Sequence, residues 1–245
     1  MTALVLTAHG SADPRSAANA RSVADQIRRL RPGLGFHTAF CEQNSPRLDD
    51  VLSGLTGDAV VAPLLLAGAY HARVDIPVMM AESAARRRRP GGSGVNVRQA
   101  DVLGEDERLV QVMRGRLAEA GVSRLDGGLG VIVVAVGSSN GAANARTARL
   151  AESLAERTRW AGVQIAFATG PAPSVAVAAE RLRAGGADHA VIAPWFLAHG
   201  RITDRVGAYA RGAGIPMAAP LGAHRLVAAT VLDRFDQAVA ARAAA

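Results

Sequence analysis

The sequence has one cysteine, few aromatic residues and no long uninterrupted apolar run. Because Cys41 is the single cysteine, an intrachain disulfide is excluded, and we expect neither a cysteine-ligated zinc site nor an iron–sulfur site. No run of about 18 apolar residues occurs, so we expect no membrane-spanning helix and no membrane partner. The first residues lack the basic and small-residue pattern of a signal peptide. These absences predict a protein of the reducing cytoplasm.

The charge balance is basic, with a net charge of +7. A basic protein can bind nucleic acid, an anionic membrane surface or a polyanionic small molecule. Biased composition is the alternative explanation, because arginine far outnumbers lysine and alanine is very common. Aromatic residues make up 4% of the chain and are not interleaved with the basic clusters. Base stacking and a nucleic-acid partner are therefore not expected.

An internal repeat organises the chain. The stretch LVLTAHGSADPRSAANAR returns as VVAVGSSNGAANARTAR, and AFCEQNSP returns as AFATGPAP. Both pairs are separated by the same offset, since Ala8 aligns with Ala135 and Ala39 aligns with Ala166. The later phrase VVAPLLLAG pairs with VIAPWFLAH in the same order. We therefore predict a duplication of about 120 residues.

Short Val- and Leu-rich runs alternate with longer helical patterns in each half. In the first half we predict strands at 3–8, 36–41, 59–65 and 95–98, and helices at 16–30, 46–55, 74–88 and 105–120. In the second half the predicted strands lie near 130–136, 163–168, 188–194 and 215–218. Such alternation predicts parallel sheets with right-handed crossovers. We expect two α/β domains, at 1–121 and 130–245, each with about four parallel strands flanked by helices.

Three polar side chains follow successive strands of the first half. His9 comes directly after the first predicted strand, Glu42 after the second and His71 after the third. The carboxyl ends of parallel strands meet at one edge of a sheet, so we expect these side chains to converge there. Two imidazoles and a carboxylate can bind a first-row divalent metal or transfer protons near neutral pH. A lone histidine after a strand is commonly a hydrogen-bonded turn residue, but three such residues on one edge favour a functional site.

The second half has lost all three groups. The corresponding positions hold Val136, Thr169 and Ile202. His199, in the phrase LAHGR, is similar to the histidine of the first AHGS phrase but follows the third strand, so we expect a non-catalytic loop histidine, with a contact facing the cleft as the alternative. The sequence therefore predicts one functional site rather than two.

The ordered motifs resemble those of a known enzyme family. LVLTAHGSADPR, FCEQNSP, PLLLAGAYHARVDIP and DVLGEDERL together are similar to the sirohydrochlorin chelatases in their long two-domain form. The resemblance covers essentially the whole chain. It implies two duplicated chelatase-like α/β domains with the active site in the cleft between them. The first domain then carries the catalytic residues, and the second is a degenerate repeat.

The resemblance also implies an activity and a set of site residues. The activity is that of a lyase that inserts Fe2+ or Co2+ into sirohydrochlorin, on the way to sirohaem or cobalamin. His9 and His71 match the family's two catalytic histidines, and Glu42 completes the metal site with them. The metal is then a substrate, and we expect no permanently bound cofactor. Candidates for contacts with the substrate are Ser11, Arg15 and Arg73.

The residue types suit this chemistry. Metal insertion removes two pyrrole N–H protons and delivers one divalent ion to the same nitrogens. Neutral imidazoles can accept protons and can bind the ion. A closed tetrahedral cage would not release the metal, so the ligand set needs open positions. Because the duplication supplies both domains within one chain, we expect a monomer.

Two other interpretations stay open at this point. The chain could be a metallochaperone or tetrapyrrole carrier that binds without turnover. It could also be a nucleotide-binding or phosphoryl-transfer protein, although it lacks a G-x-x-x-x-G-K-[ST] loop and a G-x-G-x-x-G fingerprint. The residues do not separate iron, cobalt and nickel, since all accept histidine and carboxylate ligands. We take iron as the first choice and cobalt as the second.

Overall fold

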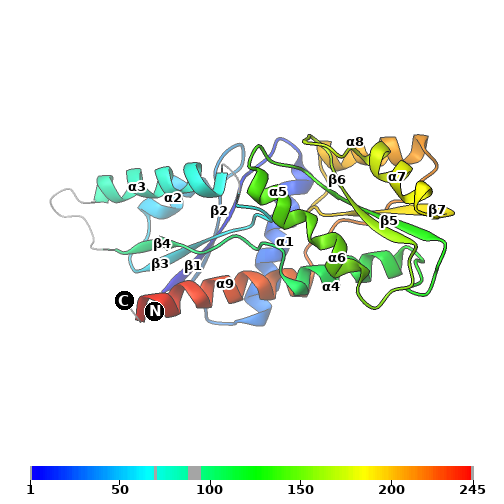
Figure 1. Ribbon diagram of the computed structural model, residues 1–245. Coiled ribbons are helices and arrows are strands. Elements are labelled where there is room, and N and C mark those ends of the chain that lie inside the picture. The colour runs from blue at the N-terminus through cyan, green and yellow to red at the C-terminus, as the bar shows by residue number, and fades with distance from the viewer. Residues whose placement is uncertain (1, 69–70, 88–94, 244–245) are drawn as a thin grey trace. The chain divides into compact units, whose positions relative to one another are not determined.

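Strands and helices alternate along most of the chain (Figure 1), and in the first half they follow the order that the sequence predicts. The computed structural model describes residues 2–68, 71–87 and 95–243. The backbone of His71 lies inside the described part, and its side chain lies outside it. The chain divides into two compact units, one formed by Met1–Gly104 with Ala223–Ala245 and the other by Glu105–Gly222.

The first unit contains a sheet of four parallel strands in the order β2-β1-β3-β4. The strands are β1 (Ala3–Ala8), β2 (Phe36–Phe40), β3 (Ala59–Pro63) and β4 (Val97–Gln99). In β1, Leu4 lies opposite Phe36 on one side and Val60 on the other. Leu4, Val5 and Leu6 are completely buried, because helices cover both faces of the sheet. The parallel α/β arrangement predicted for the first half is confirmed.

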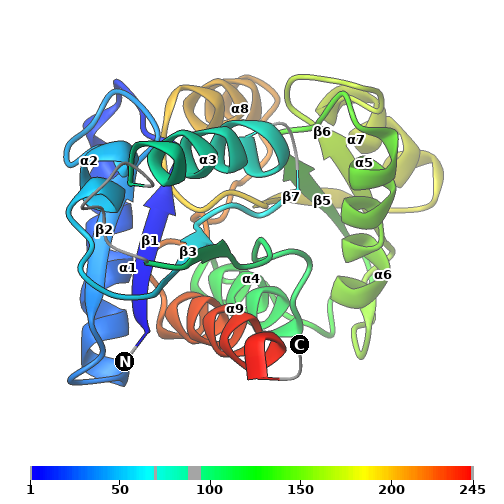
Figure 2. The same ribbon diagram turned by 90° about the vertical axis from the view of Figure 1, so that its left-hand side faces the viewer.

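Helices lie on both faces of this sheet (Figure 2). They are α1 (Pro14–Leu30), α2 (Leu48–Ser53), the π-helical turn η1 (His71–Asp75), α3 (Ile76–Arg87) and α9 (Arg225–Ala243). α1 and α9 pack together on one face, and α2 and α3 pack together on the other. Asp13 caps α1 by accepting a hydrogen bond from the N–H of Arg15, and Pro14 stands where its missing N–H is not needed. α1 therefore begins just past the loop that leaves β1.

The second unit repeats this plan with three strands. β5 (Leu129–Ala135) lies between β6 (Gly162–Phe167) and β7 (His189–Pro194), and all pair in parallel. The helices are α4 (Glu107–Glu119), α5 (Gly141–Ala148), α6 (Leu150–Ala155), α7 (Val175–Ala184) and α8 (Arg201–Gly212). α7 and α8 share an apolar core with the sheet, to which Ile132, Leu182 and Val206 contribute. α4 and α6 pack against each other, with α4 on β7 and α6 on β6.

The strand predicted near 215–218 is reduced to an isolated bridge between Ile192 and Met217. The N–H of Ile192 donates to the carbonyl of Pro216, and the N–H of Ala218 donates to the carbonyl of Ile192. Pro216 and Pro220 have no N–H to donate, which limits the ladder on both sides of the bridge. The second sheet therefore has three strands rather than the predicted four.

The last helix of each repeat packs in the unit of the other repeat. α4 ends the first repeat and packs on β7 in the second unit, whereas α9 ends the second repeat and packs on β3 and α1 in the first unit. Arg234 of α9 donates a hydrogen bond to the carbonyl of Leu103 at 2.9 Å. Arg31 of α1 forms a bidentate ion pair with Asp236 of α9 at 2.6 Å. The compact units therefore differ from the predicted division at 121–130, which separates the two sequence repeats.

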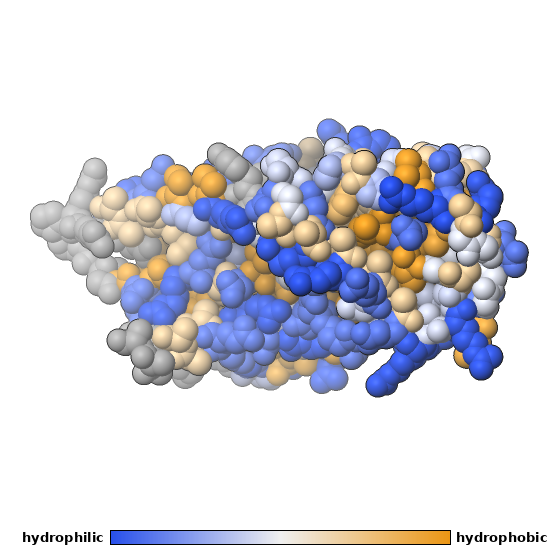
Figure 3. Space-filling model, in the orientation of Figure 1, coloured by the Kyte–Doolittle hydropathy of each residue, from blue (hydrophilic) through white to orange (hydrophobic). Residues whose placement is uncertain are grey.

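α9 buries apolar side chains on its inner side. Val227, Val231 and Phe235 are buried, while the outward surface along α9 is mainly hydrophilic (Figure 3). Within the described residues, no helix combines the length and the apolar content that crossing a lipid bilayer requires.

We predict that Phe235→Ala destabilises the first unit. The side chain is 4% exposed, and truncation of a buried phenylalanine typically costs about 3–5 kcal/mol. Amide hydrogen exchange should show lost protection in residues 59–63 of β3. Asp236→Ala is the control on the same helix, because an exposed ion pair contributes about 0–1 kcal/mol. Loss of protection confined to residues 129–135 of β5 would contradict the packing of α9.

Candidate functional site

Three loops leave the carboxyl ends of neighbouring strands in the first sheet. His9 directly follows β1, Glu42 lies in the loop after β2, and η1, which begins at His71, follows β3. π-Helical turns occur frequently at functional sites. The backbone thus brings all three predicted positions to one edge of the sheet, as expected from the sequence.

His9 and Glu42 lie opposite each other. Nδ1 of His9 is 3.6 Å from Oε1 of Glu42, and their side chains are 30% and 49% exposed. Nδ1 also lies 3.0 Å from the carbonyl oxygen of Gly10. A carbonyl oxygen can only accept, so this contact favours the tautomer with the proton on Nδ1 and the lone pair on Nε2. Nε2 is therefore the nitrogen of His9 that can bind a metal ion or accept a proton.

The main chain holds the loops after β1 and β2 in close contact. The N–H of Glu42 donates to the carbonyl of His9 at 3.0 Å, which continues the pairing of β1 with β2 past the strand ends. Gly10 has a φ of +98°, and a Cβ there would lie 1.8 Å from the carbonyl oxygen of Glu42. Both the backbone conformation and the lack of space therefore require glycine at this position.

Two further residues of the loop after β2, Gln43 and Asn44, contact this pair of loops but were not singled out from the sequence. Nε2 of Gln43 donates a hydrogen bond to Oε1 of Glu42 at 2.9 Å. Oδ1 of Asn44 accepts a hydrogen bond from the N–H of Ser11 at 2.8 Å. The repeat alignment held a usable signal, because it pairs Gln43 with Gly170.

The three candidates for substrate contacts have different surroundings. Oγ of Ser11 accepts a hydrogen bond from the N–H of Asp13, so it supports the turn into α1. Arg15 forms an ion pair with Asp13 at 2.6 Å. Arg73 is exposed on η1. A contact with substrate stays a prediction for all three.

Burial and nearby charges shift the pKa of the Cys41 thiol. The pKa of Cys41 is raised to about 11, mainly by burial and further by the carboxylates of Asp75 and Glu42, while Arg47 opposes this rise. Asp75 ends η1, so the end of η1 and the loop after β2 both lie near this thiol. Asp75 and Glu42 thus place negative charge near Cys41, and Arg47 places positive charge there.

The structure describes the side chains of two of the three predicted metal ligands. His9 and Glu42 form the described pair, and the predicted third ligand, His71, has its side chain outside the described part. Among the side chains that are described, no group of three His, Cys, Asp or Glu residues is close enough to hold a metal ion. The role of His71 therefore stays a prediction.

The second repeat keeps the backbone arrangement with different side chains. Gly137 has a φ of +94°, and a Cβ there would lie 1.9 Å from the carbonyl oxygen of Gly170. The N–H of Thr169 donates to the carbonyl of Val136 at 3.0 Å. Val136 is 39% exposed, and Ile202 packs partly against the apolar core. The positions of the imidazoles and the carboxylate thus hold aliphatic and hydroxyl side chains in this repeat.

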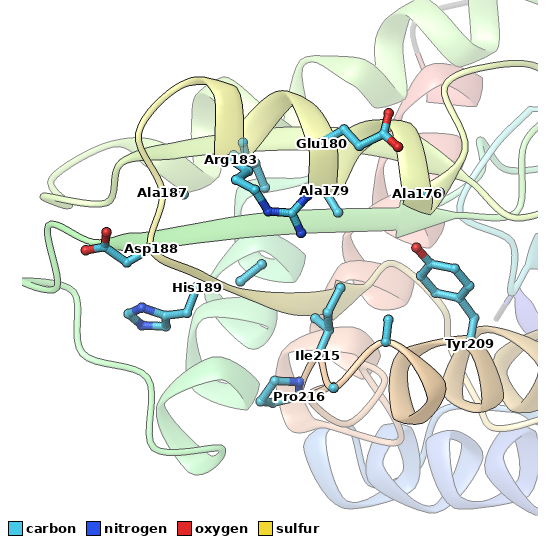
Figure 4. Close-up of a pocket in the computed structure, with 14 residues that line it drawn as sticks. Ala176, Ala179, Glu180, Arg183, Ala187, Asp188, His189, Tyr209, Ile215 and Pro216 are labelled. Carbon is cyan, nitrogen blue, oxygen red and sulfur yellow. The ribbon is translucent and has the colours of Figure 1, made fainter.

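A hollow of about 560 Å³ lies elsewhere in the second unit, between α7, the start of β7 and the end of α8 (Figure 4). Arg183 and Tyr209 reach toward it, whereas Nε2 of His189 lies 3.1 Å from a carboxylate oxygen of Asp126. The residues predicted for the site are not among those that line it. His199, exposed between β7 and α8, does not line it either. We assign this hollow no part in the chemistry of the His9 site.

Comparison with known proteins identifies the family. A family model described as CbiX matches the chain twice, over residues 3–120 and 130–238. The chain belongs to the CbiX family. The sirohydrochlorin cobaltochelatase of Priestia megaterium is 27% identical over 213 residues, which is 84% of this chain and 67% of that protein. The sirohydrochlorin cobaltochelatase of Saccharolobus solfataricus is 31% identical over 124 residues, which is 49% of this chain and 95% of that protein.

The fold of this CbiX-family chain also matches a solved structure. SirB from Bacillus subtilis, solved with Fe3+, has a TM-score of 0.79 and 22% identity, over 96% of this chain and 94% of that one. The likeness confirms the predicted α/β fold, with two parallel sheets flanked by helices. The predicted resemblance to sirohydrochlorin chelatases is likewise confirmed by the family match.

The close approach at Gly10 can be tested by substitution. Gly10→Ala and Gly33→Ala both force alanine into a left-handed conformation, since φ is +98° and +84°, and this costs about 1 kcal/mol. A Cβ added at Gly33 would have no atom within 4 Å, whereas one added at Gly10 would meet a backbone carbonyl. Gly10→Ala should therefore lower the free energy of unfolding clearly more, and Gly137→Ala should resemble it. Equal losses for Gly10→Ala and Gly33→Ala in urea unfolding would contradict the contact.

The thiol of Cys41 should be unreactive in the folded protein. Its pKa of about 11 keeps it protonated at pH 8, and the thiolate is the reactive form. Ellman's reagent at pH 8 should therefore label the native chain very slowly and the urea-unfolded chain rapidly. Rapid labelling of the native chain would show that the loop after β2 leaves this thiol open to solvent.

Proposed function

We propose that this chain inserts a divalent metal ion into sirohydrochlorin. The observation that carries the proposal is the pair of His9 and Glu42, 3.6 Å apart at the carboxyl edge of the first sheet. Membership of the CbiX family supports it, and so do the names of the two relatives, both sirohydrochlorin cobaltochelatases. Fe2+ and Co2+ are both proposed as the ion, since SirB, which shares the fold, was solved with Fe3+ in one structure and with cobalt in another, and both relatives are named cobaltochelatases.

The metal ion is a substrate that must bind and then leave with the product. In the proposed site it is bound by Nε2 of His9, a carboxylate oxygen of Glu42 and an imidazole nitrogen of His71. The carboxylate offsets part of the charge of the ion. Closed four-ligand cages retain their metal, so a set of three protein ligands with open positions suits an ion that has to be released.

Insertion exchanges two protons for one divalent ion. Two pyrrole N–H bonds break, their electron pairs stay on nitrogen and bind the metal, and two protons leave the ring. His9 and His71 are the proposed proton acceptors, because a neutral imidazole accepts a proton near neutral pH. An imidazole that hands its metal ion to the ring regains the lone pair that this step needs.

The substrate is expected to be recognised by charge as well as shape. Sirohydrochlorin carries many carboxylates on a flat ring, and the chain has a net charge of +7, which favours the approach of an anion. Ser11, Arg15 and Arg73 are the proposed contacts. Arg15 would exchange its partner Asp13 for a substrate carboxylate.

We also propose that the chain acts as a monomer in the cytoplasm, without a permanently bound cofactor. The repeats at 1–121 and 130–245 supply both domains within one chain. The second repeat keeps the backbone arrangement of Gly137 and Thr169 without the metal ligands. One tetrapyrrole needs one metal site, so selection for chemistry acts on the first repeat alone.

A carrier that binds metal or pigment without turnover is the alternative function. Absorbance of the metallated product separates the two, because an enzyme forms many equivalents of product per chain and a carrier forms no more than it can hold. Initial rates with Fe2+ and Co2+ in competition then identify the preferred ion.

Removal of either imidazole should lower the insertion rate. His9→Ala and His71→Ala should each reduce the initial rate by about 10²–10⁴-fold, the usual contribution of a proton-transferring side chain. His199→Ala is the control, because His199 is exposed on a loop of the second unit. Circular dichroism should show all three variants folded. If His199→Ala proves as damaging as His9→Ala, the assignment of the site to the first repeat is wrong.

A further inference from the structure

Gln43 has a backbone conformation that is unusual for its residue type. Its φ is +59°, in the left-handed region that favours glycine. The equivalent position of the second repeat is Gly170, with a φ of +94°. The first repeat therefore keeps a glutamine where glycine would be better suited to the backbone. Strained residues of this kind concentrate at functional sites.

The side chain of Gln43 has a specific contact that glycine could not make. Its Nε2 donates a hydrogen bond to Oε1 of Glu42 at 2.9 Å. The same Oε1 lies 3.6 Å from Nδ1 of His9. The amide thus holds the carboxylate oxygen that faces the imidazole, and it leaves the charge of the carboxylate unchanged.

Asn44 ties the loop after β2 to the loop after β1. Its Oδ1 accepts a hydrogen bond from the N–H of Ser11 at 2.8 Å. In the second repeat the equivalent N–H, that of Ser138, donates instead to Asn144 of the following helix at 2.9 Å. Asn44 itself aligns with Pro171, whose side chain has no acceptor. In the first repeat this hydrogen bond therefore joins two loops. In the second repeat the equivalent N–H is bonded within the loop after β5 and the helix that follows it.

We propose that Gln43 and Asn44 are positioning residues that hold the Glu42 carboxylate opposite His9 for metal binding. Gln43 fixes the carboxylate directly, and Asn44 fixes the distance between the two loops that carry the ligands. The proposal rests on the proposed function, because it assigns these amides to the same metal site. Hydrogen-bond partners of metal ligands typically contribute about 10–100-fold in metal affinity.

Gln43→Gly separates positioning from folding. Glycine accepts a positive φ without strain, so the variant should be at least as stable as the natural chain. It removes the hydrogen bond to Glu42, so the Kd for Co2+ should rise by about tenfold. Calorimetric titration of the intact chain with Co2+ measures the affinity, and thermal unfolding without metal measures the stability.

Arg157→Gly is the matched control. Arg157 has a φ of +58° and is exposed, like Gln43, but lies in the second unit. Its replacement relieves the same backbone strain and should leave the Kd for Co2+ unchanged. Unchanged Co2+ affinity in Gln43→Gly, or an equal loss in Arg157→Gly, would overturn the role of Gln43.

Asn44 is tested through the acceptor that it supplies. Asn44→Ala should raise the Kd for Co2+ by about tenfold, and Asn44→Asp, which still offers an oxygen to the N–H of Ser11, should restore it. Asn144→Ala removes the corresponding bond in the second repeat, so it should lower stability and leave Co2+ affinity unchanged. If Asn44→Asp binds Co2+ as weakly as Asn44→Ala, the hydrogen bond from the N–H of Ser11 does not determine the affinity for Co2+.

His9→Ala separates failure of this proposal from failure of the proposed function. If His9→Ala binds Co2+ as tightly as the natural chain, the metal site is elsewhere and the proposed function fails with it. If His9→Ala loses Co2+ affinity while Gln43→Gly and Asn44→Ala keep it, the metal site stands and only the positioning roles are rejected.

Discussion

Gly10 passes so close to the loop after β2 that a single added carbon would lie 1.8 Å from the carbonyl oxygen of Glu42. This contact sets the spacing of the two loops, and the hydrogen bond from the N–H of Glu42 to the carbonyl of His9 fixes their register. The His9 ring and the Glu42 carboxylate are side chains of that backbone frame. The distance of 3.6 Å between Nδ1 of His9 and Oε1 of Glu42 follows from it, and so does the presence of an imidazole and a carboxylate side by side at this edge of the sheet.

The second repeat has the same backbone arrangement as the first but lacks the imidazole and carboxylate side chains. Gly137 approaches the carbonyl of Gly170 as closely as Gly10 approaches that of Glu42, yet Val136 and Thr169 stand where the first repeat has His9 and Glu42. The same backbone contacts are present in both repeats. Ligands are needed at one site for one tetrapyrrole, so their loss from the second repeat carries no penalty for the proposed reaction.

Most strands and helices, and the convergence of His9 and Glu42 at one edge of the first sheet, could be predicted from the sequence. Both depend on local sequence pattern. Buried runs such as 3–8 and the shared offset of the repeats predict the sheets, and strand ends place His9 and Glu42 together. The exchange of α4 and α9 between the units could not be predicted, since burial of Phe235 depends on tertiary packing rather than on periodicity. The left-handed conformation of Gln43 is unusual for glutamine, and its signal in the sequence is the pairing of Gln43 with Gly170 in the repeat alignment.

The central claim is that the first repeat holds the one metal site of the chain, built on the contact between the loops after β1 and β2. Anomalous diffraction at the cobalt absorption edge, from crystals of the intact chain equilibrated with Co2+, tests it most directly. The account predicts a peak within bonding distance of Nε2 of His9 and a carboxylate oxygen of Glu42, with no peak beside Val136. A peak beside Val136 or His199, with none at His9, would contradict it.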